Sequence, residues 1–351
     1  MRYWFPYSAV IALFLASTQA ASAGQVFPKV LVVVNPLAPY ADEILHGVGN
    51  AQNLLRPGQE PHSFTLAPSQ ARMLAEAEIL ITPDRSINPL LDRLASRQKK
   101  LRVIELSKLN GADPLPYAKE NPWVTRVKEL GKSDGDDDHD HGHDHDHDHG
   151  HEQKTLGKPL KAQPVATTDP HFWLDPERMA AMAVPLAEAI AQSAPEHKAT
   201  LTANAKALAS HLRDDVKPAM AALLKAKAAS PYTTPKPQIP FITYHAAYGY
   251  FLQRFSITDD GAITIRPEDY MGAKTLNDLL NAATKVYIRC VIAEEDSPLV
   301  KRVAKASGAK IVILSPEQQV DENDVPPLDW VKNGYDRLLY KTAKSFSECL
   351  G

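Results

Sequence analysis

Lys29-Val30-Leu31-Val32-Val33-Val34 is the stretch that decides the fold. It is a continuous run of apolar, mostly β-branched residues, which is typical of a strand that is buried on both faces by helices. Short apolar runs of the same kind alternate with helical patterns along the next 70 or so residues. The runs lie at 53–55, 79–82 and 102–106, and the helical patterns lie at 40–50, 69–77 and 88–97. Strands that alternate with helices predict a parallel sheet with helices on both faces.

The same alternation returns in the last third of the chain. Strand patterns lie at 239–244, 262–265, 286–288, 291–293 and 310–314, with helical patterns at 275–283 and 298–307. Between the two α/β regions the chain is rich in alanine and helical in pattern, and a helix of about 30 residues, or about 45 Å, is expected from Pro195 to about Ala229. The predicted fold is therefore α/β, with two parallel-sheet lobes joined by a long rigid helix.

The domain boundaries follow from these patterns. We expect an N-terminal lobe over 24–176, a helical region over 177–230 and a C-terminal lobe over 231–351. Residues 1–23 are set apart as a signal peptide, because Arg2 precedes the apolar run Ala9–Ala16 and Ala21-Ser22-Ala23 has the form of a cleavage site. The run is too short for a permanent membrane anchor. The mature protein is therefore expected to be exported and soluble.

Residues 134–152, DGDDDHDHGHDHDHDHGHE, contain no apolar side chain. Such a segment cannot form a core, and we expect a disordered loop over about 132–155 within the first lobe. Its imidazoles and carboxylates are ligands that divalent transition metals prefer, which indicates weak auxiliary zinc sites. A metal-indifferent spacer is the alternative. The seven histidines in the loop are His139, His141, His143, His145, His147, His149 and His151.

The chain has two cysteines, Cys290 and Cys349. In an oxidising compartment an isolated pair predicts one disulfide, which would tie the C-terminal tail to the body of the protein. Two buried free thiols are the alternative. A zinc–thiolate site is disfavoured, because the two cysteines do not have the close spacing of such sites.

The charge distribution argues against a nucleic acid partner. The net charge of the chain is −3. The acidic loop is by itself more negative than this, so the rest of the chain is mildly basic. Lysine and arginine are scattered along the sequence and do not cluster with aromatic residues.

Three histidines outside the loop occupy connections that follow predicted strands. His62 follows the first lobe's second strand, His171 lies in Asp169-Pro170-His171-Phe172-Trp173-Leu174-Asp175-Pro176, and His245 directly follows the strand 239–244. Ligands of open α/β sheets bind at the carboxyl ends of the strands. Because they come from separate segments across both lobes, we expect these three imidazoles to converge on one metal site. His197 and His211, which lie among polar residues, are expected to be solvated.

Four segments resemble the zinc-binding receptors of bacterial ABC importers, the ZnuA-like group. The first is Pro57-Gly58-x-x-Pro61-His62-x-Phe64-x-Leu66-x-Pro68-Ser69, and the second is Asp169–Pro176. The third is Tyr244-His245-x-Ala247-Tyr248-Gly249-Tyr250-Phe251, and the fourth is Cys290–Glu294 together with Cys349. The His-rich loop between the first and second segments is similar to that of zinc-type members. The resemblance extends over nearly all of the mature chain.

This resemblance implies His62, His171 and His245 as Zn²⁺ ligands in a cleft between the lobes, which suits a tetrahedral ion with one position left over. It also implies capture of Zn²⁺ in the periplasm and delivery to the membrane subunit of an ABC permease, by a protein that is a monomer and not an enzyme.

The chain departs from the family pattern at three places. Ser315 stands where related manganese receptors have a carboxylate after a late strand, so water or Glu60 is expected in the fourth position. Ala246 replaces an aspartate that commonly follows the third histidine, and the partner that orients His245 is expected to be missing or replaced. The segment Gln318–Asp329 matches no family pattern, and Glu322 or Asp324 is a weak further candidate near the cleft.

Other functional classes stay open at this point. A periplasmic zinc buffer or chaperone, or a metal-binding adhesin of the same fold, would have the same ligands. An exported zinc hydrolase could also use three histidines and an open position, but it would need a general base beside it. The sequence has no H-E-x-x-H and no G-x-S-x-G motif, which disfavours the hydrolase.

Overall fold

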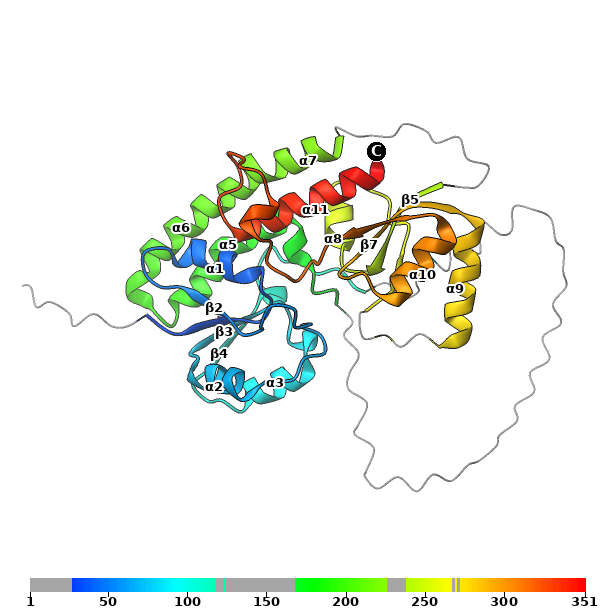
Figure 1. Ribbon diagram of the computed structural model, residues 1–351. Helices are drawn as coiled ribbons and strands as arrows, with labels where there is room; N and C mark the ends of the chain where they lie inside the picture. The colour runs from blue at the N-terminus through cyan, green and yellow to red at the C-terminus, as the bar shows by residue number, and fades with distance from the viewer. Residues whose placement is uncertain (1–26, 118–122, 124–167, 226–237, 267–268, 270–271) are drawn as a thin grey trace, which may run out of the picture.

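The computed structural model describes residues 27–117, 123, 168–225, 238–266, 269 and 272–351. Within this part of the chain the strands form two four-stranded sheets, and all pairings in both sheets are parallel. Figure 1 shows the two sheets side by side, with helices around them. The predicted class, two parallel-sheet α/β lobes, is confirmed.

The first sheet has the order β2-β1-β3-β4. Its strands are β1 (Val30–Val32), β2 (Ala51–Asn53), β3 (Ile79–Thr82) and β4 (Arg102–Glu105). All residues of β1 and β3 are buried, as expected of strands that helices cover on both faces. β2 begins two residues before the run 53–55 that was predicted as a strand.

Short helices connect these strands. They are α1 (Leu37–Leu45), α2 (Pro68–Glu76) and α3 (Pro89–Ser96). The start of α3 is encoded locally, because the Asn88 side chain accepts the N–H of Leu91 and Pro89 stands in the first turn, where no N–H is needed. α1 begins three residues before the predicted start and ends at Leu45.

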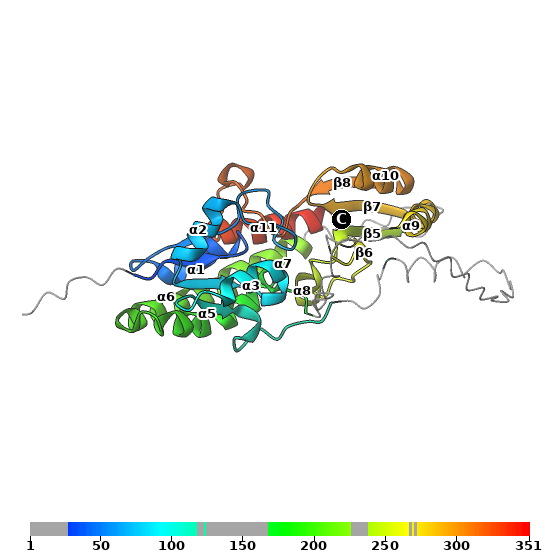
Figure 2. The same cartoon turned by 90° about the horizontal axis from the view of Figure 1, so that it is seen from below.

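The second sheet repeats the arrangement with the order β6-β5-β7-β8. Its strands are β5 (Gln238–His245), β6 (Ala262–Thr264), β7 (Tyr287–Ala293) and β8 (Lys310–Ile313). The two runs predicted as strands at 286–288 and 291–293 form the single strand β7. The helices of this lobe are α8 (Gly249–Arg254), α9 (Ala273–Lys285) and α10 (Pro298–Ser307), and Figure 2 shows α10 against β7 and β8.

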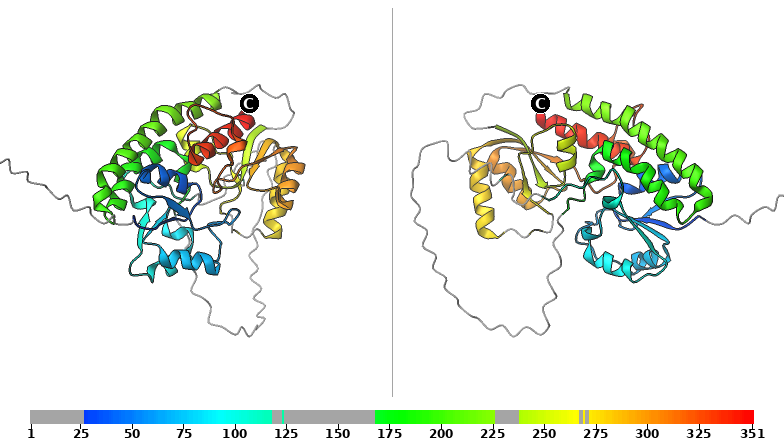
Figure 3. Two further views of the ribbon diagram at one scale, coloured as in Figure 1. Left: turned by 60° about the vertical axis from the view of Figure 1, so that its left-hand side comes forward. Right: turned by 180° about the vertical axis from the view of Figure 1, so that it is seen from behind.

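Long helices connect the lobes. α5 (Pro176–Ala191) packs along α6 (Lys198–His211), which continues through a π-helical turn at Leu212–Val216 into α7 (Lys217–Lys225). In Figure 3, α6 and α7 form one rod that extends beside both sheets. The expected long helix is therefore present over residues 198–225, and the remaining positions to Ala229 lie outside the described residues.

The C-terminal helix α11 (Gly334–Leu350) was not predicted. It contacts α7, α1 and β5, so it reaches elements of both lobes (Figure 3). Asn333 caps its first turn by accepting the N–H groups of Tyr335 and Asp336.

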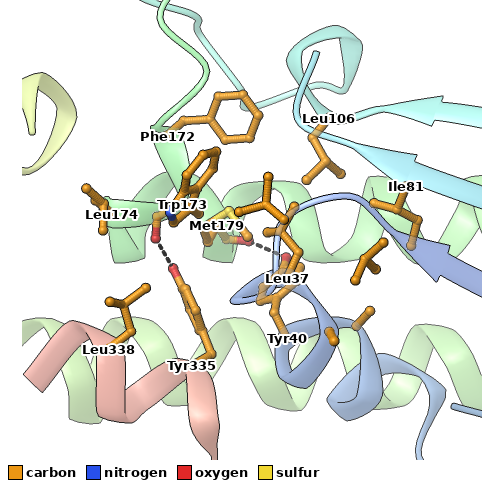
Figure 4. Packing of buried hydrophobic residues seen from close by; sticks show 14 of the residues in the cluster. Leu37, Tyr40, Ile81, Leu106, Phe172, Trp173, Leu174, Met179, Tyr335 and Leu338 are labelled. Carbon is orange, nitrogen blue, oxygen red and sulfur yellow. Dashed lines mark hydrogen bonds between the residues drawn. The ribbon is translucent and has the colours of Figure 1, made fainter. Parts of the chain in front are cut away.

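One apolar core extends through both lobes. It contains residues of β1 and α1, residues of α5, α6 and α11, and the face of the second sheet that carries Phe241 and Ile292. Figure 4 shows two buried tyrosines that join its helices: Tyr40 Oη donates to the carbonyl of Met179 at 2.7 Å, and Tyr335 Oη donates to the carbonyl of Trp173 at 2.5 Å. A large apolar interface of this kind restricts movement of one lobe against the other.

The predicted disulfide is confirmed. Cys290 of β7 is bonded to Cys349 of α11, with 5.6 Å between their Cα atoms, and both residues are buried. The bond therefore ties the C-terminal helix to the second sheet.

Two sequence predictions fall outside the described residues: the signal peptide over 1–23, and the His-rich loop over 132–155 with its seven histidines. Among the helices that the structure does describe, none is long and apolar enough to cross a membrane.

Candidate metal centre

His62 lies in a turn between β2 and α2. The side chain of Asn88 reaches this turn and donates to the carbonyls of Pro61 (3.4 Å) and Phe64 (3.3 Å), on either side of the histidine. The His62 side chain is only 4% exposed, so the turn presents it to the interior of the cleft.

His171 lies directly before a 3-10 turn, Phe172–Leu174, whose three side chains are buried in the shared core. The imidazole is fully buried. Asp169 Oδ1 lies 2.7 Å from Nδ1 of His171, which leaves Nε2 as the free ligand atom. Burial of Phe172 and Trp173 therefore fixes the backbone, and Asp169 fixes the ring.

His245 is the last residue of β5 and is also fully buried. Its Nδ1 lies 2.7 Å from Oε1 of Glu294, the residue that follows β7. Because of Ala246, the carboxylate partner of His245 was expected to be missing or replaced. Glu294 is the replacement. The neighbouring strand supplies the replacement, since β5 and β7 are paired in the sheet.

Glu317 is the candidate ligand that sequence reasoning missed. It lies after β8, it is 2% exposed, and its Oε1 is 3.2 Å from Nε2 of both His62 and His171. The distance from the same oxygen to His245 Nε2 is 3.7 Å. The expected position, Ser315, has no carboxylate, but the chain supplies one two residues later.

The loop that carries Glu317 is held from both sides. Tyr248 Oη donates to the carbonyl of Leu314 at 3.1 Å, and Trp173 Nε1 donates to the carbonyl of Pro316 at 2.8 Å. Both donors belong to segments that also carry a histidine of the site. The loop geometry is therefore set by the same buried residues that set the imidazoles.

The four groups have the spacing of a metal site. One ligand atom from each of His62, His171, His245 and Glu317 can be chosen so that all lie within 4.8 Å of one another, and the Nε2 atoms of His171 and His245 are 3.3 Å apart. Ligands 2.0–2.1 Å from a tetrahedral ion lie about 3.3 Å from one another. Most of the measured separations agree with this value. In the described part of the chain, this is the group of His, Cys, Asp and Glu side chains that could hold an ion.

Near neutral pH the metal-free site holds charge of both signs, negative on Glu317 and positive on His171. Burial opposes its ionisation, but hydrogen bonds from His171 and His62 hold its pKa well below the usual range. Burial also lowers the pKa of His171, yet the charges of Asp169 and Glu317 outweigh this and raise it to about 10. Burial and the neighbouring charge of Glu317 raise the pKa of Glu60 to about 8. Near neutral pH, Glu317 is therefore ionised, whereas Glu60 is mostly protonated.

Glu60 lies at the edge of the site. Its Oε1 is 3.9 Å from Nε2 of His62 and accepts the backbone N–H of the same residue at 3.1 Å. It lines a cavity of about 330 Å³, and of the four groups Glu317 lines the same cavity. The other lining residues are Gly58, Tyr244, Glu294, Glu295, Ser315, Glu317 and Gln318. Glu60 as a fourth ligand stays a prediction, and Glu322 and Asp324 do not line this cavity.

Comparisons with known proteins identify the family of the chain. The family model described as zinc-uptake complex component A, periplasmic (ZnuA), matches residues 30–349. The chain is 30% identical over 349 residues to the high-affinity zinc uptake system protein ZnuA of Brucella abortus (strain 2308), covering 99% of this chain and 97% of the relative.

Solved structures show the same fold at lower identity. The crystal structure of ZnuA superposes with a TM-score of 0.63 at 17% identity, covering 93% of this chain and 100% of the other. The Zn(II)-bound ZnuA-like domain of AdcA from Streptococcus pneumoniae superposes with a TM-score of 0.59 at 18% identity, covering 92% and 99%.

Proposed function

The chain belongs to the family of periplasmic zinc-uptake component A proteins, and from that membership we propose that His62, His171, His245 and Glu317 capture Zn²⁺ for delivery to an ABC permease. The observation that carries the proposal is the convergence of these four groups, which come from segments of both lobes and whose side chains are at most 4% exposed. The protein acts as the zinc receptor of the importer, and the ion is its cargo.

The donor set supports zinc over harder cations. Three imidazole nitrogens and one carboxylate oxygen suit Zn²⁺, whereas manganese and magnesium prefer sites that are richer in oxygen. Ser315 stands where related manganese receptors have a carboxylate, which by itself would favour zinc. Glu317 supplies a carboxylate nearby, so selectivity depends on the three histidines rather than on the absence of an oxygen ligand.

The same donor set supports a receptor over a zinc hydrolase. A catalytic zinc ion needs one open position for water or substrate, and sites with four protein ligands lack it. Here Glu317 lies within 3.7 Å of all three Nε2 atoms and occupies the fourth corner. We propose that the protein binds and releases the ion without chemistry, as a periplasmic monomer with no nucleic acid partner.

Metal content after native purification tests the ligand assignment. The unchanged protein is expected to carry one tightly held zinc ion, and the His62→Ala variant is expected to lose it. The Glu188→Gln variant, which alters an exposed residue of α5, serves as a matched control and should keep the ion. Retention of tightly held zinc by His62→Ala would contradict the proposed site.

Growth under zinc chelation tests the transport step. A deletion strain should stop growing in chelator, and added zinc but not manganese should restore it. The gene for the His171→Ala variant should fail to complement the strain. Full complementation by this variant would argue for a role that does not use the buried site.

A further inference from the structure

Gln318, the residue after Glu317, spans the cleft with its side-chain amide. Its Oε1 accepts the backbone N–H of Gly58 at 3.1 Å and Nδ2 of Asn35 at 3.3 Å. Its Nε2 lies 3.4 Å from the carbonyl of Gln59, to which it donates. Gln318 follows β8 of the second sheet, whereas its three partners follow β1 and β2 of the first sheet. Both the oxygen and the nitrogen of this side-chain amide therefore bond to the first lobe.

The partners of Gln318 belong to a rigid turn. Gln59 Oε1 accepts the N–H of Arg56 at 2.8 Å and is 2.6 Å from Nε2 of Gln70, which itself donates to the carbonyl of Leu54. Gly58 has φ of +80°, a left-handed conformation that favours glycine. This turn leads directly into Glu60 and His62, so Gln318 holds the segment that carries the first histidine.

Gln318 also borders the path from the site to solvent. It lines the cavity of about 330 Å³ that contains Glu317, and it lines a second cavity of about 500 Å³ on its other side, together with Asn35. The side chain is thus part of the wall between the two cavities. If its bonds were broken, the cleft beside the ion would widen.

We propose that Gln318 is an interlobe latch that positions the His62 turn against Glu317 and slows release of the bound Zn²⁺; this inference rests on the proposed function of the site. The shared core restricts large movements of the lobes, so release is expected to need only a local opening, and Gln318 bonds the two lobes at this edge. Each of the three hydrogen bonds of Gln318 contributes little net free energy, because water competes for the same groups. One side chain makes all three bonds, so one substitution removes them together. The latch therefore controls the rate of release more than the rate of capture.

Stopped-flow release into excess chelator tests the latch. Gln318→Ala is expected to release zinc about tenfold faster, as loss of about 1.4 kcal/mol would produce, with an association rate close to that of the unchanged protein. Gln319→Ala is the matched control, because exposed Gln319 also bonds across the lobes, to the carbonyl of Asn35, but makes no described bond to the turn that carries His62. It should release zinc within about twofold of the unchanged rate.

The outcomes separate the latch from the site. Equal release rates for Gln318→Ala and the unchanged protein would overturn the latch and leave the ligands in place, and so would an equal acceleration in Gln319→Ala. Absence of a tight site in the unchanged protein would overturn the proposed function itself.

Hydrogen exchange gives a test that needs no substitution. The Gly58 amide is expected to be protected from hydrogen exchange in the zinc-bound protein, because Oε1 of Gln318 accepts a hydrogen bond from its N–H. Free exchange of this amide with zinc bound would overturn the latch.

Discussion

Asp169 Oδ1 makes two contacts with the same residue: it lies 2.7 Å from Nδ1 of His171, and it accepts the backbone N–H of His171 at 2.9 Å. The carboxylate therefore fixes both the ring and the main chain of one proposed ligand. Tyr250 Oη donates to the backbone carbonyl of Asp169 at 2.7 Å, which ties this segment to the second lobe. A second carboxylate lies beside another imidazole of the site, where Oε1 of Glu294 is 2.7 Å from Nδ1 of His245.

Asp169→Asn is expected to weaken zinc binding by about 10–100-fold, because removal of a carboxylate that orients a metal-bound histidine has effects of this size. The ligand itself remains, so the site should still bind one ion. Competition against a chromophoric chelator near neutral pH measures the change, with Glu188→Gln as the control. An affinity unchanged from that of the control would mean that packing alone orients His171.

A second prediction separates the two glutamates of the site. Glu317→Gln is expected to weaken zinc binding by about 100-fold or more, because it removes the anion that lies within reach of all three imidazoles. Glu60→Gln keeps the shape of the side chain and should change the affinity by less than about threefold, because its oxygen lies 3.9 Å from the nearest imidazole nitrogen. The same chelator competition measures both variants. A larger loss in Glu60→Gln would make Glu60 the fourth ligand.

The residues of the site differ in how far the sequence could predict them. His62, His171 and His245 lie in recognisable local motifs, and the structure brings all three together. His245 ends β5, whereas His62 lies in a turn after β2 and His171 directly before a 3-10 turn. Glu317 has no such motif. Its loop is held by hydrogen bonds from Trp173 and Tyr248, which are distant in sequence, so no local pattern indicates that this carboxylate points inward.

The fold shows the same division between local and distant causes. The strands were predicted from continuous apolar runs, which are a local property. Helix α11 was not predicted, although Asn333 gives a capping signal at its start. The contacts that hold the helix in place are with α7, α1 and β5, which are distant in sequence. The prediction that His211 is solvated was wrong for a similar reason, since its side chain is only 9% exposed and its partner Asp336 is 125 residues away.

His211 predicts a pH-dependent stability that is independent of the metal. Its Nε2 lies 3.0 Å from Oδ2 of the fully buried Asp336, and its Nδ1 lies 2.9 Å from Oδ2 of Asp215. The hydrogen bond to Asp336 raises the pKa of His211 above its usual value, although burial and the charge of Lys332 oppose this. The protonated form is therefore favoured by folding. Its contribution is complete below the unfolded pKa of about 6.5 and is lost as the pH rises through the folded pKa.

The variant His211→Gln should consequently lose about 1–2 kcal/mol of unfolding free energy near pH 6, and less at pH values above the folded pKa. Urea unfolding of the zinc-free protein across this range measures the difference between variant and unchanged protein. His197→Gln, at an N-terminal position of α6, is the control. A difference that grows as the pH rises would contradict the assigned direction.

The disulfide should contribute to stability and not to binding. Replacing both Cys290 and Cys349 by alanine is expected to lower the unfolding free energy by about 4 kcal/mol, because the bond closes a loop of 59 residues. Zinc affinity should stay within about twofold, because neither cysteine belongs to the metal site. Denaturant unfolding with and without reductant provides the measurement, and reductant should have no effect on the double variant. Equal stability of the two proteins would mean that packing of α11 suffices.

Deletion of residues 134–152 tests the His-rich loop, which lies outside the described residues. Its seven histidines supply many ligands, but their spacing along a polar segment provides no preorganised geometry, so each ion should bind more weakly than at the buried site. Calorimetric titration of the deletion variant should show the one tight site unchanged and the weak sites gone. In the unchanged protein, loading of the weak sites should fall steeply between about pH 7 and 5.5, because imidazoles that titrate near 6.5 then bind protons in place of zinc. Loss of the tight site on deletion would mean that the loop supplies a ligand to it, and a flat pH response would mean that the weak sites are formed by carboxylates alone.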